Sequence, residues 1–260
     1  MTTMEHVGIN KTRCKVAILV GDPCRVDIIC NHFGRNKKLS SKRGFLISET
    51  IINDIKVLVI STGIGCPSLA IVVEELCMLG LKIFLRVGTC GAINDELSPG
   101  SIIISTGAVR EEGTSRQYID QTYPAIADFE LVYIFSKTLC NYAGGYYCGI
   151  THTKDSFYSE KVELQISSVF HKEQWEKWKK AGVAATDMET SCLYIVSSLR
   201  KVKSCSILIS VGEDKSDVRI TKCLKFILDS LPDIIGDINK ILPQNDIIEN
   251  KYIKINSFLE

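Results

Sequence analysis

The stretch Ile83-Phe84-Leu85-Arg86-Val87-Gly88-Thr89-Cys90-Gly91-Ala92 decides how this chain of 260 residues is interpreted. Its apolar beginning predicts a buried strand, and the arginine stands where that strand ends. Arginine offers a planar and permanently charged set of donors. The glycines on either side of the Thr-Cys pair let backbone N–H groups approach an anion closely. The stretch therefore predicts an oxyanion site, although an arginine at a strand end also suits a structural ion pair.

A second stretch of the same kind is Gly21-Asp22-Pro23-Cys24-Arg25, which follows the apolar run 15–20. Glycine and proline end that run, and the spacing of Val26, Ile29 and Phe33 predicts a short helix that begins near the arginine. A strand, a glycine turn and a helix N-terminus that carries an arginine are typical of an anion pocket. Alone, the stretch equally suits an ordinary strand-to-helix turn. Together, the two stretches strengthen the prediction of an anion site.

Length, composition and charge exclude several classes of protein. With 45% hydrophobic and 23% charged residues, the chain is not disordered and can bury a sizeable core as one large domain. A net charge of +1 attracts neither nucleic acid nor an acidic membrane surface. The apolar runs are too short to span a membrane, and the N-terminus lacks the apolar core of a signal peptide. We therefore expect a cytoplasmic protein with no nucleic-acid and no membrane partner.

Eleven cysteines are spread along the chain, and none forms a Cys-x-x-Cys pair. An odd number, distributed over a long chain, suits neither a disulfide framework nor a zinc site. We expect reduced and mostly buried thiols.

Apolar strand-like runs alternate with helical patterns. The strand-like runs are 16–20, 57–61, 83–87, 102–106, 147–151 and 206–211, and the helical patterns are 68–79, 129–142, 173–181, 190–199 and 220–242. The alternation predicts a single-domain α/β fold with a mixed, mostly parallel sheet flanked by helices. We assign this domain to residues 1–243. Residues 244–260 form a polar C-terminal extension of unknown role.

Further motifs occur in the order in which they occur in one enzyme family. They are His6-Val7-Gly8-Ile9, Lys42-Arg43-Gly44, Gly63-Ile64-Gly65-Cys66-Pro67-Ser68, Val73-Glu74-Glu75-Leu76, Ala108-Val109-Arg110-Glu111, Tyr123-Pro124-Ala125-Ile126-Ala127-Asp128, Lys154-Asp155-Ser156-Phe157-Tyr158 and Asp187-Met188-Glu189-Thr190. With them, nearly the whole chain resembles the nucleoside phosphorylase family of uridine phosphorylases and hexameric purine nucleoside phosphorylases. The resemblance implies a closed, twisted central sheet. It also implies phosphorolysis of a ribonucleoside to free base and ribose 1-phosphate.

The resemblance assigns the phosphate site to the two anion motifs. Gly21, Arg25, Arg86 and Thr89 would hydrogen-bond the phosphate oxygens, and Arg86 would also be catalytic. Arg43 of a neighbouring subunit would complete the cluster, whereas by itself the basic run around this residue suits a solvated face. Inorganic phosphate is then a co-substrate, and no cofactor is expected.

Glu189 is the residue that we expect to hold the ribose and to act in catalysis. A carboxylate accepts hydrogen bonds from two adjacent hydroxyls, and its charge favours an oxocarbenium-like transition state. Met188 offers the sugar an apolar surface, and His6 resembles the histidine that reaches the 5′-hydroxyl in a neighbouring subunit. Sites shared in this way imply a homo-oligomer of dimers, built into a hexamer. By themselves, Asp187 and Glu189 equally suit helix N-terminal carboxylates, and Asp187 is left out of the predicted site.

The residues that would recognise the base are less well matched. Phe157 stands where the family stacks an aromatic ring on the base, and segment 170–183 resembles an insertion of uridine phosphorylases. The uracil-reading glutamine and arginine should follow Tyr158, but the chain offers Gln165 and no arginine. Uracil selectivity is therefore open on this evidence alone.

The purine branch of the family places an aspartate after the last strand, where this chain has Val211 and Gly212. Glu213 and Asp214 are the nearest substitutes. The insertion and the missing aspartate favour uridine, because uracil can leave as an anion without a carboxylate beside it. Purine nucleosides such as inosine or guanosine are the alternative.

No strongly bound metal is expected. The potassium site of some uridine phosphorylases uses a glutamate, an isoleucine and a serine. Ile64 and Ser68 match two of these positions, but Gly44 occupies the glutamate position.

Three other functions are weighed against phosphorolysis. The Gly63-x-Gly65 turn suits a dinucleotide-binding oxidoreductase, but Ser68 replaces the third glycine and the expected acidic residue is absent. A hydrolytic nucleosidase would not need both Arg25 and Arg86. A non-catalytic nucleoside-binding relative is the third alternative, since the base-recognition motifs are incomplete.

Overall fold

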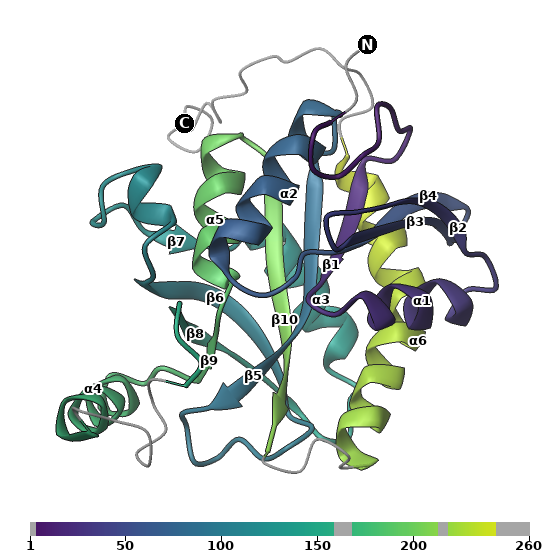
Figure 1. Ribbon diagram of the computed structural model, residues 1–260. Coiled ribbons are helices and arrows are strands. Elements are labelled where there is room, and N and C mark those ends of the chain that lie inside the picture. The colour runs from purple at the N-terminus through teal and green to yellow at the C-terminus, as the bar shows by residue number, and fades with distance from the viewer. Residues whose placement is uncertain (1–3, 159–167, 213–217, 243–260) are drawn as a thin grey trace, which may run out of the picture.

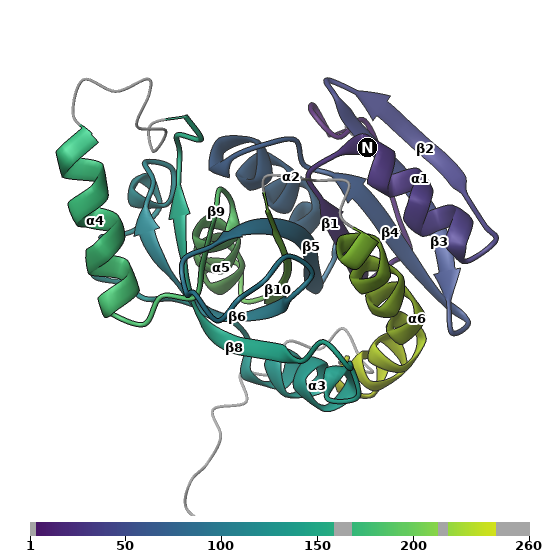
Figure 2. The same ribbon diagram turned by 90° about the horizontal axis from the view of Figure 1, so that it is seen from below.

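The computed structural model describes residues 4–158, 168–212 and 218–242. One mixed sheet lies between two groups of helices, as the view from below in Figure 2 shows. One face is covered by α2 (Cys66–Met78) and α5 (Thr190–Leu199), and the other by α1 (Pro23–His32), α3 (Phe129–Leu139) and α6 (Val218–Ile241). This arrangement confirms the predicted single α/β domain.

Parallel strands form the centre of the sheet (Figure 1). The strand β1 (Val16–Val20) lies between β4 (Ile55–Ser61) and β5 (Ile83–Ala92), and β5 also pairs in parallel with β10 (Lys203–Val211). Every residue of β1 is buried because helices cover both faces. The shared direction brings the ends of these strands to one edge of the sheet, where both predicted anion motifs lie.

Further strands widen the sheet on both sides of this centre. On one side, β4 pairs with β3, and β3 pairs with the edge strand β2. On the other side, β10 pairs with β6, β6 with β8, β8 with β9, and β9 returns to β5, while β7 pairs with β6. The sheet thus curls back on itself. The bounds are β2 (Lys37–Lys42), β3 (Phe45–Ile52), β6 (Ile102–Glu111), β7 (Ala125–Ile126), β8 (Tyr146–Lys154) and β9 (Ala185–Asp187).

All predicted strands and helices are present, but the sequence did not predict the hairpin of β2 and β3. The lysines and serines of β2 are largely exposed, because this strand forms an edge of the sheet. Lysine on an edge strand prevents further pairing, which makes the strand resemble a solvated basic loop in sequence.

Local sequence explains where several helices begin. The side chain of Asp22 accepts a hydrogen bond from the N–H of Cys24 at 2.9 Å, and Pro23 occupies the first turn of α1. In contrast, α2 is preceded by Gly65, which has a φ of 92° and provides no side-chain cap. The first N–H groups of α2 are therefore available to a partner elsewhere in the chain.

The remaining elements lie at the periphery. A short 3-10 helix spans Ser115–Gln117, and α4 (Ser168–Lys180) stands to one side of the sheet in Figure 1. The cysteines are all free, and most are buried, as expected. Among the helices of the described segments, none has the length and apolar content needed to cross a bilayer.

Candidate functional site

Arg86 is the centre of a buried charge cluster. Only 3% of its surface is exposed. Its Nη2 pairs with Oε2 of Glu189, and its Nε lies 3.4 Å from Oδ2 of Asp187. Burial lowers the pKa of Arg86, but these carboxylates raise it more, so the guanidinium stays charged. Its Nη1 is buried and has no hydrogen-bond partner among the described residues. A buried, unpartnered N–H of this kind suits an anionic ligand.

Gly88 provides the space that the Arg86 guanidinium occupies. Side chains two residues apart on a strand share a face, and a Cβ at position 88 would lie 2.9 Å from Nη2 of Arg86. It would also lie 2.9 Å from Cδ2 of Leu208 on β10. From the sequence, this glycine would serve the approach of an anion to the backbone. In the structure, its contact is with the arginine.

Glu189 is held from two directions. Its Oε1 accepts a hydrogen bond from the N–H of Gly65 at 2.7 Å, and its Oε2 pairs with Arg86. Gly65 begins α2, so the carboxylate lies at the positive end of a helix dipole. Burial and the nearby charge of Asp187 raise the pKa of Glu189, whereas the charge of Arg86 lowers it. Each carboxylate oxygen keeps a lone pair, which suits two adjacent hydroxyls of a sugar.

Asp187, which was left out of the predicted site, anchors the segment that carries Glu189. Its Oδ2 accepts hydrogen bonds from Oγ1 and N of Thr190, at 2.6 and 3.1 Å. Its Oδ1 accepts from Oγ1 of Thr153 on β8 at 2.9 Å. Asp187 therefore caps α5, the alternative that the sequence had offered, and also stands beside Arg86. Its place after an apolar run and before a helix was the signal for this role.

Arg25 and Gly21 bring the first anion motif to the same edge of the sheet. Burial lowers the pKa of Arg25, Asp22 opposes this, and the charge of nearby Arg86 lowers it further. Two guanidinium groups that repel each other are stabilised by an anion between them. A Cβ at Gly21 would lie 3.5 Å from the carbonyl oxygen of Gly63, so the turns after β1 and β4 are neighbours. Thr89 is partly exposed on β5 at this edge.

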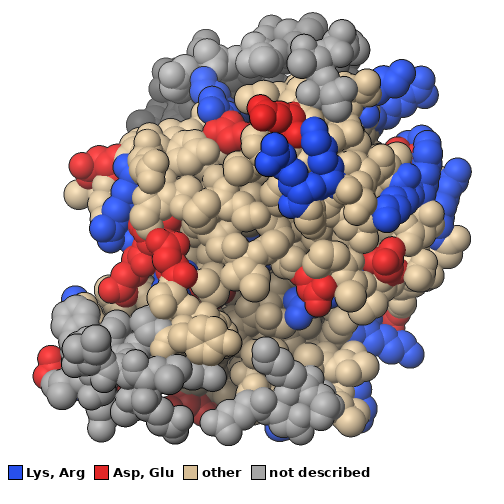
Figure 3. Space-filling view, in the orientation of Figure 1, with Lys and Arg blue, Asp and Glu red and all other residues tan. Residues whose placement is uncertain are grey.

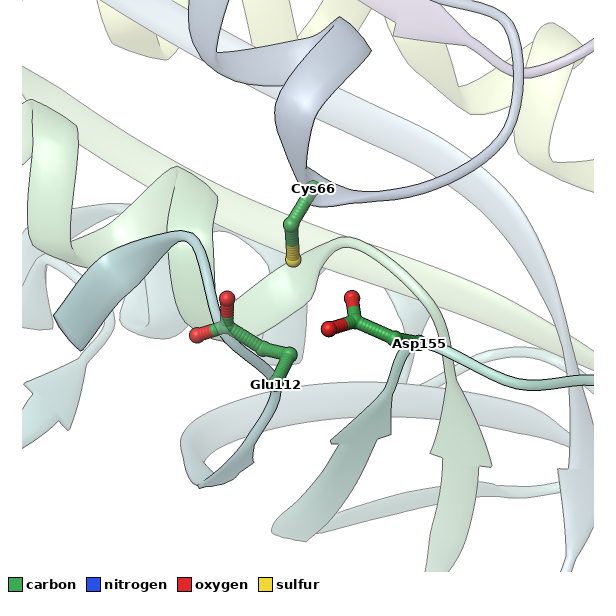
Figure 4. A group of neighbouring side chains, drawn as sticks. All are labelled: Cys66, Glu112 and Asp155. Carbon is green, nitrogen blue, oxygen red and sulfur yellow. The ribbon is translucent and has the colours of Figure 1, made fainter. Parts of the chain in front are cut away.

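Cys66, Glu112 and Asp155 point toward one another beside this cluster (Figure 4). Their ligand atoms lie within 4.8 Å of one another. The carboxylate of Glu112, however, already accepts four hydrogen bonds, which come from N of Thr114, N and Oγ of Ser115, and Oγ of Ser191. Those bonds use the lone pairs that a metal ion would need.

The thiol of Cys66 has a structural partner as well. Its Sγ donates to the carbonyl oxygen of Met188 at 3.3 Å. Contact with the Cys192 thiol, burial and nearby carboxylates raise the pKa of Cys66, so the thiol stays protonated. Of the three side chains in Figure 4, Cys66 therefore contacts the backbone of Met188, whose own side chain is partly exposed.

A sequence model of the phosphorylase superfamily matches residues 15–232. The chain belongs to the phosphorylase superfamily. Among solved structures of the superfamily, the uridine phosphorylase from Vibrio fischeri ES114 in complex with 6-hydroxy-1-naphthoic acid is similar to it, with a TM-score of 0.81. The two are 30% identical, and the match covers 92% of this chain and 97% of the other.

Curated members of the superfamily are similar over most of their length. The uridine phosphorylase of Treponema pallidum (strain Nichols) is 33% identical over 214 residues, which cover 80% of this chain and 81% of the relative. That of Escherichia coli K12 is 34% identical over 195 residues, or 72% and 77%. The guanosine phosphorylase of Halorubrum lacusprofundi is 31% identical over 193 residues, or 74% and 76%.

Two of the predicted site residues lie away from the charge cluster of this superfamily member. His6 contacts Glu75, which follows Gly65 by ten residues in α2, or about 15 Å along a helix axis. Arg43 is exposed in the turn between β2 and β3, with a φ of 52°. Figure 3 shows basic side chains gathered on the side of the molecule where β2 lies. Neither residue reaches Glu189 within one subunit through the contacts described.

The predicted base-binding residues are the least defined by the structure. Phe157 follows β8 and is 52% exposed, with its ring centroid 5.2 Å from that of Tyr158. Gln165, Glu213 and Asp214 lie outside the described residues.

The predicted insertion 170–183 covers most of α4, which contacts β6 and β8 through side chains that the sequence did not reveal. Nε1 of Trp178 donates to Glu111 at 3.2 Å, and Nε2 of the buried His152 lies 2.5 Å from the same carboxylate. These residues come from three separate segments, so no local pattern could have joined them.

Proposed function

We propose that the protein catalyses phosphorolysis of a ribonucleoside to free base and ribose 1-phosphate, and that uridine is its favoured substrate. The observation that carries this proposal is the position of Arg86. One nitrogen of its guanidinium pairs with Glu189, and another is buried, unpartnered and close to the charge of Arg25. A single side chain thus links a carboxylate suited to a sugar with a pocket suited to phosphate.

The roles of these residues follow from their charges. Arg25, Arg86, Thr89 and the N–H of Gly21 bind phosphate and direct one oxygen toward the anomeric carbon. The carboxylate of Glu189 accepts hydrogen bonds from the ribose hydroxyls and stabilises the positive charge that develops on the sugar. The bond from C1′ to the base nitrogen breaks, the base leaves with the electron pair, and the new bond forms from C1′ to phosphate oxygen. No cofactor is required, because inorganic phosphate is the co-substrate.

Two guanidinium groups at one site favour phosphorolysis over hydrolysis. A nucleosidase activates water, which carries no charge for two arginines to neutralise. The charge of Arg86 lowers the pKa of Arg25, and an anion between the two guanidinium groups offsets this effect. The mutual repulsion of Arg25 and Arg86 therefore supports phosphate as the nucleophile.

Uridine is favoured because the relatives from Treponema pallidum and Escherichia coli are uridine phosphorylases. The relative from Halorubrum lacusprofundi is a guanosine phosphorylase, so a purine nucleoside is the second candidate. We assign base contacts to Phe157, Gln165, Glu213 and Asp214, and an apolar contact with the ribose to Met188. The free cysteines of the protein suit an enzyme that acts in the cytoplasm.

We further propose that the functional unit is a dimer, assembled into a hexamer, in which His6 and Arg43 complete the neighbour's site. About 15 Å of helix separates Gly65, which binds Glu189, from Glu75, which binds His6. Arg43 keeps a left-handed backbone that is costly for a residue with a side chain, and such strain is concentrated at functional positions. Both features support roles outside the subunit's own site.

The test is the release of free base from uridine, guanosine, inosine, adenosine and thymidine, each with and without phosphate. We expect phosphate-dependent release, with the highest kcat/KM for uridine. A higher kcat/KM for guanosine or inosine would move the assignment to a purine phosphorylase. Release at the same rate without phosphate would contradict phosphorolysis and indicate a nucleosidase.

A further inference from the structure

Glu75 and the N-terminal turn form a hydrogen-bonded unit at the far end of α2 from Glu189. Oε1 of Glu75 accepts hydrogen bonds from the backbone N–H of His6 at 3.0 Å and from ring Nδ1 of the same residue at 2.7 Å. Oε2 accepts from the N–H of Val7 at 2.8 Å. One carboxylate therefore holds both the backbone and the ring of His6.

The carboxylate of Glu75 is ionised, although it is only 8% exposed. Burial raises its pKa, but the N–H of Val7 and the donors of His6 lower it more. An ionised carboxylate has only acceptor oxygens. Nδ1 must then donate in this contact, and the Nδ1–H tautomer presents Nε2 as a hydrogen-bond acceptor. The His6 side chain is 32% exposed, so part of the ring borders solvent.

The turn that carries His6 is fixed in other ways as well. The N–H of Met4 donates to the carbonyl of Ile9 at 3.0 Å, which closes the turn. Gly8 has a φ of 73°, and a Cβ there would lie 2.6 Å from Oγ of Ser40. The turn is thus pressed against β2, the strand that leads to Arg43. Both residues assigned to the neighbouring site therefore lie near one corner of the molecule, where the N-terminal turn meets β2.

We propose that Glu75 is a positioning residue for nucleoside binding in the neighbouring subunit. It fixes the tautomer and direction of His6, so that Nε2 accepts a hydrogen bond from the donor at the 5′ position of the ribose. This inference rests on the proposed function. It also gives α2 a double role. Gly65 at its N-terminus binds Glu189 of one site, and Glu75 positions His6 for the site of the neighbouring subunit.

Glu75→Gln tests this role with little change in shape. The carboxylate accepts from the N–H groups of His6 and Val7 and from Nδ1, whereas an amide has one acceptor oxygen and a donor NH₂ group. The variant cannot satisfy all three donors in either orientation of the amide, so its preference for Nδ1–H is weakened. We expect kcat/KM for uridine to fall about tenfold, mainly through KM, the equivalent of one well-placed hydrogen bond. 5′-Deoxyuridine lacks the hydroxyl, so its kcat/KM is expected to stay within about twofold of wild type. Equal losses with both nucleosides, or no loss with either, would overturn the proposal.

Glu74→Gln is the matched control. Glu74 precedes Glu75 in the same helix, and its carboxylate pairs with Arg200 at the surface, with Nε and Oε2 2.6 Å apart. We expect wild-type constants with both nucleosides. In the double variant of His6→Ala and Glu75→Gln, uridine turnover should equal that of His6→Ala alone, because Glu75 acts through the ring. An additional loss in the double variant would contradict that mechanism.

A second measurement separates this inference from the proposed function. The ¹⁵N chemical shifts of the neutral His6 ring report which nitrogen carries the proton, whether or not the protein turns over a nucleoside. We expect the Nδ1–H tautomer in wild type and a shift toward Nε2–H in Glu75→Gln. The same tautomer in both proteins would overturn the role of Glu75. If wild type shows the Nδ1–H tautomer but releases no base from any nucleoside, phosphorolysis is contradicted. The control of the His6 tautomer by Glu75 would still stand.

Discussion

The charge cluster of Arg86 and the corner of His6 and Arg43 use charged side chains in opposite ways. Arg86, Asp187 and Glu189 are buried and pair with one another across strand ends and helix termini. His6 and Arg43 lie on turns, and neither contacts the subunit's own cluster through the contacts described. In the function that we propose, the buried group holds the phosphate and the sugar, and the corner acts in the site of a second subunit. A site built from both depends on folding for one part and on assembly for the other.

Arg86→Ala should have the largest effect. It removes the charge shared by the phosphate pocket and Glu189, so we expect a loss of about 2–4 kcal/mol of transition-state stabilisation. The loss should appear chiefly as weaker use of phosphate, measured by varying phosphate at saturating nucleoside. Arg200→Ala removes an exposed arginine that pairs with Glu74 and serves as the control. Unchanged phosphate dependence in Arg86→Ala would make this arginine a purely structural residue.

Glu189→Gln tests the sugar side of the buried cluster. The amide keeps the shape but removes the charge that faces the developing oxocarbenium ion. We therefore expect kcat to fall more than the nucleoside KM rises, and the comparison requires both constants for uridine. If only KM changes, Glu189 binds the ribose without acting in the chemical step.

Gly88→Ala disturbs the same cluster through sterics alone. The new Cβ would lie 2.9 Å from both Nη2 of Arg86 and Cδ2 of Leu208, so the guanidinium must move. We expect a higher KM for phosphate and a loss of about 1–3 kcal/mol in the free energy of unfolding, measured by urea titration. Gly113→Ala is the control, because its Cβ would make an ordinary 3.6 Å contact with Asp155. A wild-type phosphate KM in Gly88→Ala would show that the guanidinium position is not critical.

Arg43→Ala tests whether the surface corner acts in trans. Its effect should be smaller than that of Arg86→Ala, because the buried arginines remain. Arg43→Ala and Arg86→Ala subunits, unfolded and refolded together, should give mixed dimers in which one site keeps both arginines. Activity above that of either variant refolded alone is expected. Activity no higher than theirs, in mixed dimers verified by mass spectrometry, would contradict the shared site.

The smallest effect concerns pH and the contact of Glu75 with His6. The pKa of Glu75 is lower in the folded protein than in the unfolded chain, so its ionised form stabilises the fold. That contribution is fully present above the unfolded pKa of about 4.3 and is lost as the pH falls through the folded value. The free energy of unfolding of wild type and Glu75→Gln should therefore converge on acidification, as measured by urea titration from pH 7 to pH 3. A difference that stays constant would exclude a contribution from the Glu75 charge.

The sequence alone determined most of the elements and the types of residue that carry the chemistry. Apolar periodicity placed the central strands and the helices, and the spacing of Val26, Ile29 and Phe33 predicted α1. The glycine-flanked arginines marked the edge where an anion would bind. These signals are local, because backbone preference, capping and burial depend on neighbours within a few residues.

Tertiary structure alone decided which of these residues meet. Glu189 pairs with Arg86 across 103 residues and with Gly65 across 124, and His6 meets Glu75 across 69. Asp187 proved to be an anchor, and Gly88 proved to be the space for a guanidinium, because strand order and register place them beside Arg86. Contacts of this length depend on how strands and helices stack, which no local pattern encodes. The sequence therefore determined the chemistry available to the protein, and packing decided its geometry.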